Sequence, residues 1–143
     1  MNLREICERD IPTIFEIRAS VRENRISRAD LAEIGVTEAT VTASLGSHRK
    51  GWLVEEAERL VGFSMADSAD GSIFALFVDP ESEGRGYGSR LHDAAVAWLF
   101  SRGFETIALT TDPDTRAHAF YLRRGWVLSR LNGDGEACLT LSR

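Results

Sequence analysis

Residues 73–102 contain the feature that most restricts the fold: an apolar run, a glycine-rich loop and an amphipathic segment follow one another directly. The run 73–78 is typical of a buried strand, and Asp79-Pro80 ends it because proline cannot donate a hydrogen bond to a sheet. Glycine then occupies every second position from Gly84 to Gly88. Apolar residues recur beyond the loop with the spacing of one helix face: Leu91, Ala94, Ala95, Trp98 and Leu99. The segment therefore predicts a strand, a tight loop and a helix over 86–102.

This loop has the character of a phosphate site. Glycine lets the backbone curl and approach a ligand, and the free N–H groups of a helix's first turn favour an anion. A nucleotide-hydrolysing loop needs a lysine after its glycines, but Lys50 is the only lysine of the chain. A dinucleotide fingerprint needs a glycine where Ser89 stands. A flexible surface turn is the alternative, but the position between a strand and a helix favours a phosphate loop.

A second strand and helix follow this unit. Residues 106–111 are rich in β-branched side chains and again stop at an Asp-Pro pair, at 112–113. Asp114 can cap a helix over 116–124. The expected helix contains Ala117, Phe120 and Tyr121, and Gly125 and Trp126 follow it.

Three motifs together resemble the GCN5-related N-acetyltransferase (GNAT) superfamily. They are Phe77-Val78-Asp79-Pro80, Glu83-Gly84-Arg85-Gly86-Tyr87-Gly88 and Asp114-x-x-Ala117-x-x-Phe120-Tyr121-x-x-x-Gly125-Trp126. Their order and separation match that family. The resemblance extends over the whole chain and is strongest from residue 52 to residue 126.

The patterning and the resemblance predict one GNAT-like domain over residues 1–143. Its class is α/β, with a mixed, partly parallel central sheet flanked by helices. The strands 73–78 and 106–111 are expected to be parallel, because a helix connects them in a right-handed unit. The other expected strands are 2–7, a hairpin of 52–57 and 60–66, and tail strands near 126–131 and 136–141. The other expected helices are 11–23, capped by Asp10, a short helix with a Ser27–Asp30 capping pair, and one from Thr37 to Gly46.

Composition narrows the class of protein. Apolar residues make up 43% and charged residues 27% of the chain, which is ordinary for a globular protein. No apolar run approaches the ~18 residues of a membrane span, and no signal peptide is evident, so we expect a cytoplasmic protein without a membrane partner. A net charge of −5 argues against nucleic acid and modestly favours a cationic substrate. The two cysteines and three histidines lack ligand spacing, so we expect no metal.

The resemblance implies the chemistry and its residues. It implies that an acetyl group moves directly from the co-substrate acetyl-CoA to an amine, without an acyl-enzyme. The CoA pyrophosphate is then expected on Gly84, Arg85, Gly86, Tyr87, Gly88 and Ser89, and the pantetheine arm on backbone groups of Phe77 and Val78. Asp114 and Ala117 complete the expected cofactor-binding set. The Val78 N–H would stabilise the oxyanion, and Tyr121 would be the general acid that protonates the departing thiolate.

Some positions leave alternatives open. Glu83 stands where the family has Gln or Arg, so its carboxylate must turn away from a bound pyrophosphate. Ala75 stands where many relatives place a carboxylate, which leaves the general base unassigned. The candidates for that base are Glu23, Glu55, Glu56, Asp67 or a chain of waters. Structural roles are the alternatives for three residues: Tyr121 packing beside Phe120, Arg85 as a solvated arginine, and Tyr87 as a packing residue.

Three functions follow from these features. The first is N-acetylation of a small-molecule primary amine, and the second is acetylation of a protein N-terminus or lysine. The third is a non-catalytic acyl-CoA-binding domain, against which Tyr121 argues. A homodimer is compatible with each of them. Substrate selection is expected in residues 22–50 and in the turn at 131–136, where the family signature is weakest.

Overall fold

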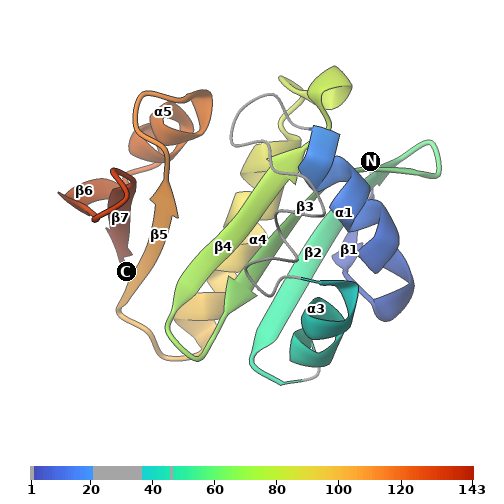
Figure 1. The fold of residues 1–143 in the computed structure, drawn as a ribbon, viewed down its shortest axis with the longest axis horizontal. Coiled ribbons are helices and arrows are strands. Elements are labelled where there is room, and N and C mark those ends of the chain that lie inside the picture. Colours follow the sequence, from blue (N-terminus) through green and yellow to red (C-terminus); the bar gives the residue numbers. More distant parts are fainter. Residues whose placement is uncertain (1, 21–36, 46) are drawn as a thin grey trace.

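A single mixed sheet organises the fold (Figure 1). The computed structural model describes residues 2–20, 37–45 and 47–143. Within these ranges seven strands follow the order β1-β2-β3-β4-β5-β7-β6. They are β1 (Asn2–Glu5), β2 (Arg49–Glu56), β3 (Arg59–Asp67), β4 (Ser72–Val78), β5 (Thr106–Thr111), β6 (Val127–Leu131) and β7 (Ala137–Ser142). The β4–β5 pair is parallel and the other neighbouring pairs are antiparallel, which confirms the predicted α/β class with a partly parallel sheet.

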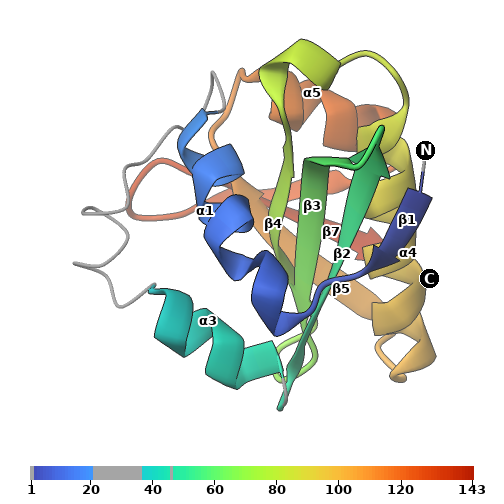
Figure 2. The ribbon, with the colours of Figure 1, turned by 90° about the vertical axis from the view of Figure 1, so that its right-hand side faces the viewer.

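Helices cover both faces of the sheet (Figure 2). The helices α1 (Ile11–Ser20) and α3 (Glu38–Leu45) lie on one side, and α4 (Tyr87–Ser101) lies on the other. The helix α5 (Arg116–Arg123) packs into the same apolar cluster as α4. Two short 3-10 helices, η1 (Glu8–Asp10) and η2 (Pro80–Ser82), precede α1 and the glycine loop.

Each face of the sheet has its own core. The predicted apolar stripe of α4 is buried against the sheet, with Leu91, Ala95 and Leu99 fully enclosed. The Ser64 hydroxyl on β3 donates a buried hydrogen bond of 3.0 Å to the Leu91 carbonyl, which ties α4 to the sheet. On the opposite face α1 contributes its own apolar stripe: Ile11, Ile14, Phe15 and Ile17.

The parallel pair of strands opens along its length. Among the described residues β4 and β5 share one register pair, Ser72 with Ala108, and Figure 1 shows the strands drawing apart toward α5. A bulge bends β4 at Phe74, since the register with β3 passes from Ala75 directly to Ile73. The Asp-Pro pairs end both strands as predicted. The sheet is therefore split where the predicted site residues of β4 lie.

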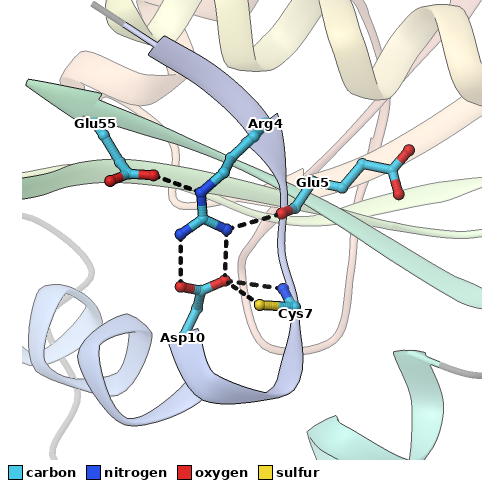
Figure 3. A network of polar contacts seen from close by, with 5 residues as sticks. All are labelled: Arg4, Glu5, Cys7, Asp10 and Glu55. Carbon is cyan, nitrogen blue, oxygen red and sulfur yellow. Dashed lines mark hydrogen bonds and ion pairs between the residues drawn. The ribbon is translucent and has the colours of Figure 1, made fainter.

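We expected Asp10 to cap α1, but it does not, because a network near the N-terminus holds its carboxylate (Figure 3). Both carboxylate oxygens accept from the Arg4 guanidinium, over 2.8 and 2.9 Å. The Cys7 N–H donates to the same carboxylate over 2.9 Å, and Arg4 also pairs with Glu55. Asp10 therefore ends η1 and ties it to Arg4 of β1, while Arg4 joins β1 to β2 through Glu55.

The cap of α5 also differs from the prediction. Thr115, not Asp114, is the N-cap, and its hydroxyl accepts from the His118 N–H over 3.2 Å. Asp114 lies one residue earlier with a φ of 63°, so the chain turns sharply before the cap. The expected short helix with Ser27 and Asp30, and the continuation of the 11–23 helix beyond Ser20, lie outside the described residues.

Candidate functional site

A groove of about 410 Å³ lies between the end of β4, the glycine loop and α5. Nine of the predicted site residues line it: Phe77, Val78, Gly84, Gly86, Tyr87, Gly88, Ser89, Ala117 and Tyr121. Arg85 and Asp114 are exposed and are not part of its wall. The fold therefore brings most of the predicted residues together, from three elements that are separate in the sequence.

The glycine loop gives the groove an anion-binding end. Gly84 and Gly86 have φ values of 79° and 83°, a conformation that residues with a side chain rarely adopt. Gly86 is the N-cap of α4, so the N–H groups of the first helical turn are unpaired within the helix. That turn contains no acidic residue. A phosphate group at this end would meet backbone donors and the positive end of the helix dipole.

Glu83 lines the groove, so its side chain does not turn away as we expected, but an ion pair balances its charge. Its carboxylate pairs with the Arg116 guanidinium of α5, on the other wall of the groove. The pair bridges the η2–α4 loop and α5 and neutralises an acid that would otherwise repel a phosphate. A departure from the family's residue is thus balanced locally.

The backbone N–H of Val78 points into the gap between β4 and β5. The N–H of Asp79 donates over 2.7 Å to the Val61 carbonyl, toward β3. Successive N–H groups of an extended strand face opposite edges, so the Val78 N–H faces away from β3. The same alternation turns the backbone of Phe77 toward Phe63 on β3. Phe77 therefore contributes its side chain to the groove, and not the free backbone groups that we expected.

Tyr121 lies deep in the site. Only 6% of its surface is exposed to solvent. Its ring packs edge-to-face on the rings of Phe120 and Trp126, whose centroids lie 5.4 and 5.8 Å from its own. Its hydroxyl makes no hydrogen bond with another described residue. Burial raises the pKa of Tyr121 above its ordinary value, so the phenol keeps its proton at neutral pH.

A second cavity of about 380 Å³ shares part of its wall with the groove. Leu76, Phe77, Ala117 and Tyr121 line both cavities. The polar residues of its wall come from α1, from the end of β5 and from the turn before β7: Arg18, Thr110, Thr111, Asp112 and Glu136. Tyr121 therefore belongs to the wall shared by a groove that suits a phosphate compound and a small cavity with polar residues.

The described candidates for the general base are engaged elsewhere. Glu55 pairs with Arg4, and Asp67 pairs with His48 and Arg49. Glu56 accepts a 2.7 Å hydrogen bond from the Tyr87 hydroxyl, which lowers the pKa of Glu56. None of these three lines either cavity. Glu23 lies outside the described residues.

The sequence patterns missed Arg18 and Glu136 as site residues. Arg18 had a signal, because it stands four residues after Ile14 and seven after Ile11, in the apolar stripe of α1. A charge at such a position points to a cavity or a partner in the core. Glu136 lies within the turn that we expected to select the substrate, but no pattern distinguished it from a surface acid.

Within the described ranges no three side chains of His, Cys, Asp or Glu gather as a metal ion would require. Among the same residues no helix combines the length and apolar character needed to cross a membrane.

Known proteins are similar to this chain in sequence and in fold. The profile of the acetyltransferase (GNAT) family matches residues 12–126. Over 61 residues the chain is 39% identical to a mycothiol acetyltransferase from Beutenbergia cavernae; the match covers 42% of this chain and 20% of that relative. The chain therefore spans a fifth of the curated relative's length in this match.

Solved structures extend the similarity to the whole fold. The PaiA N-acetyltransferase from Thermoplasma acidophilum, in complex with coenzyme A, superposes with a TM-score of 0.80 at 13% identity, covering 100% of both chains. A GCN5-related N-acetyltransferase from Rhodopseudomonas palustris also reaches 0.80, at 22% identity, covering 99% of this chain and 95% of that one. The chain belongs to the GNAT acetyltransferase family, which confirms the resemblance found in the sequence.

Proposed function

We propose that this protein is an acetyl-CoA-dependent N-acetyltransferase that transfers the acetyl group directly to a small-molecule primary amine. The observation that supports this most is the place of Tyr121, which lines both the glycine-loop groove and the second cavity. A proton donor lining both can protonate the departing sulfur of a thioester in the groove when an amine in the second cavity attacks it. Membership of an acetyltransferase family supplies the type of reaction.

The groove suits CoA. The N–H groups of the glycine loop and the first turn of α4 would hold the pyrophosphate, and the gap beside β4 would receive the pantetheine arm. Acetyl-CoA supplies a thioester whose carbonyl oxygen gains negative charge when a nucleophile adds to it. The Val78 N–H, which points into the gap, is oriented to donate to such an oxygen.

The proposed transfer balances with residues of this chain. A neutral amine adds to the thioester carbon, the new C–N bond forms and the C–S bond breaks. Tyr121 gives its proton to the departing sulfur, and the proton lost by the amine nitrogen returns to the phenolate through water. The products are an amide and a free thiol, and no acetyl group is attached to the protein.

A small acceptor is favoured by the second cavity. Its volume of about 380 Å³ lies in the range of small-molecule sites. The net charge of −5 attracts ammonium groups to the protein. The similar curated relative is named for mycothiol and not for a protein acceptor.

The experiment is a screen of the full chain with acetyl-CoA, primary amines and short peptides, with thiol release and the mass of the acetylated product as readouts. We expect thiol release with small amines and an unmodified protein mass during turnover. Stable acetylation of the protein would overturn direct transfer. Binding of acetyl-CoA without transfer to any amine or peptide would support the non-catalytic alternative, and transfer to peptides alone would support the protein acetyltransferase.

A further inference from the structure

We propose that the second cavity recognises acceptors that carry a carboxylate beside the primary amine, with Arg18 as the carboxylate-binding residue. This inference rests on the proposed function and narrows its substrate class. The relevant observation is the distribution of charge in the cavity, which is positive on the α1 side and negative where β5 ends and β7 begins.

Arg18 provides the positive side. It replaces an apolar residue in the buried stripe of α1, and its guanidinium lies over the Phe77 ring, 4.3 Å from the ring centroid. The side chain is half-buried, and burial lowers the pKa of Arg18 from its ordinary value without discharging it. Guanidinium groups bind carboxylates through two parallel hydrogen bonds, and a partly desolvated site strengthens that contact.

Asp112 and Glu136 provide the negative side. Asp112 directly follows β5, and Glu136 directly precedes β7. The register pairs Thr111 with Ala137, so both acids stand at the same end of these two strands. Both line the second cavity, together with the hydroxyl-bearing residues Thr110 and Thr111.

The turn before β7 holds Glu136 in place. The Asn132 amide donates to the Glu136 carboxylate over 3.1 Å. The side-chain oxygen Oδ1 of Asn132 in turn accepts from the Glu136 backbone N–H over 2.9 Å. One asparagine therefore fixes both the backbone and the side chain of this acid, in the turn that we expected to select the substrate.

The two charged sides set the orientation of an acceptor. An amino-acid-like molecule would place its amine near Tyr121, Asp112 and Glu136, and its carboxylate near Arg18. The ammonium form would be attracted by the acids, and its nitrogen would lie on the side of Tyr121. An amine without an anionic group would lose the Arg18 contact, and a diamine would place a second positive charge against it.

Matched amine pairs test this inference. We would compare alanine with ethylamine, leucine with 3-methylbutylamine, and phenylalanine with 2-phenylethylamine, and express kcat/KM per concentration of neutral amine. Calorimetry of each compound with the CoA-saturated protein gives a readout that does not need turnover. We expect the carboxylate-bearing member to be favoured about 10- to 100-fold, the usual effect of a charge-assisted contact.

Variants assign the preference to Arg18. Arg18→Met replaces the guanidinium over Phe77 by an uncharged, unbranched side chain and should bring the two members of each pair to similar values. Arg18→Lys should retain part of the preference. The control Arg102→Gln removes an exposed arginine that lines neither cavity and should leave the preference unchanged.

The outcomes separate this inference from the proposed function. Acetylation of uncharged amines with equal or greater efficiency would overturn the inference and leave the N-acetyltransferase assignment standing. A carboxylate preference that persists in Arg18→Met would also overturn it. So would the absence of both binding and turnover for every carboxylate-bearing amine in the wild-type protein.

Discussion

The indole Nε1 of Trp126 donates a hydrogen bond of 2.9 Å to Nε2 of His92, inside the aromatic cluster that surrounds Tyr121. Because Nε2 accepts this bond, the ring proton of His92 lies on Nδ1, which donates to Asp93 over 2.9 Å. Burial lowers the pKa of His92, so the imidazole is neutral at physiological pH. The bond joins Trp126, which directly precedes β6, to α4 and thereby supports the aromatic cluster in which Tyr121 packs.

The first prediction concerns this support. Trp126→Phe leaves an aromatic ring but removes the donor, so the buried Nε2 of His92 loses its partner. We expect a loss of about 1–3 kcal/mol in the free energy of unfolding, measured by urea denaturation. His92→Phe and the double variant complete a cycle, and additive effects would show that the two residues are not coupled.

The second prediction concerns the phosphate end of the groove. Gly86→Glu places a side chain and a negative charge at the N-cap of α4, and calorimetry should show that acetyl-CoA binding is lost. Gly103→Glu is the matched control, since Gly103 also has a positive φ, of 99°, and likewise has no neighbouring atoms within 4 Å. It lies beyond the other end of α4. Equal acetyl-CoA affinity in the two variants would contradict the assignment of the loop.

The third prediction concerns the general acid. Tyr121→Phe keeps the ring and its contacts with Phe120 and Trp126 but removes the proton donor. We expect kcat to fall about 10²- to 10⁴-fold, with the Kd of acetyl-CoA nearly unchanged. Single-turnover rates should fall with it if loss of the thiolate limits the reaction. Wild-type values of both rates would assign Tyr121 to packing alone.

The sequence predicted the strands, α4 and the glycine loop because each depends on short-range rules. Periodicity identified the Leu91–Leu99 stripe, and proline marked where β4 and β5 end. The side of β4 to which each N–H points depends on strand register, which a single sequence does not specify. That is why Phe77 was expected to offer its backbone, although Val78 faces the gap.

The polar partners were harder to predict, because they join distant parts of the chain. Asp10 was expected as a helix cap, but a guanidinium held in β1 competes for its carboxylate. The partner of Glu83 lies on α5, and the second cavity combines residues of α1, β4, β5 and the last turn. Such combinations arise only when the whole sheet is assembled.

The fourth prediction follows from the network in Figure 3. Arg4 lowers the pKa of Asp10 to about 2, from 3.8 in the unfolded chain. The charged carboxylate therefore stabilises the fold above pH 3.8, and this stabilisation is lost as the pH falls through 3.8 toward 2. Its size is about 2 kcal/mol. Urea denaturation of wild type and Asp10→Asn should differ most near neutral pH and converge in acid, and a gap independent of pH would contradict the assigned pKa.

The fifth prediction concerns the ion pair between Glu83 and Arg116, which spans the groove. Glu83→Gln removes a negative charge beside the expected phosphate position and leaves the guanidinium of Arg116 without this acid. We therefore expect acetyl-CoA to bind about 2- to 5-fold more tightly, as the small energies of exposed ion pairs imply. The gain should shrink as salt is raised, because the interactions are between exposed charges.

Arg116→Gln completes this test from the other side of the groove. It leaves Glu83 as an unbalanced acid next to the phosphate end, so acetyl-CoA affinity should fall, and Glu83→Gln in the same chain should restore part of it. Calorimetry at two salt concentrations measures all four proteins. If Glu83→Gln weakened binding instead, the carboxylate would have to serve the cofactor itself, for example by holding the loop in its binding conformation.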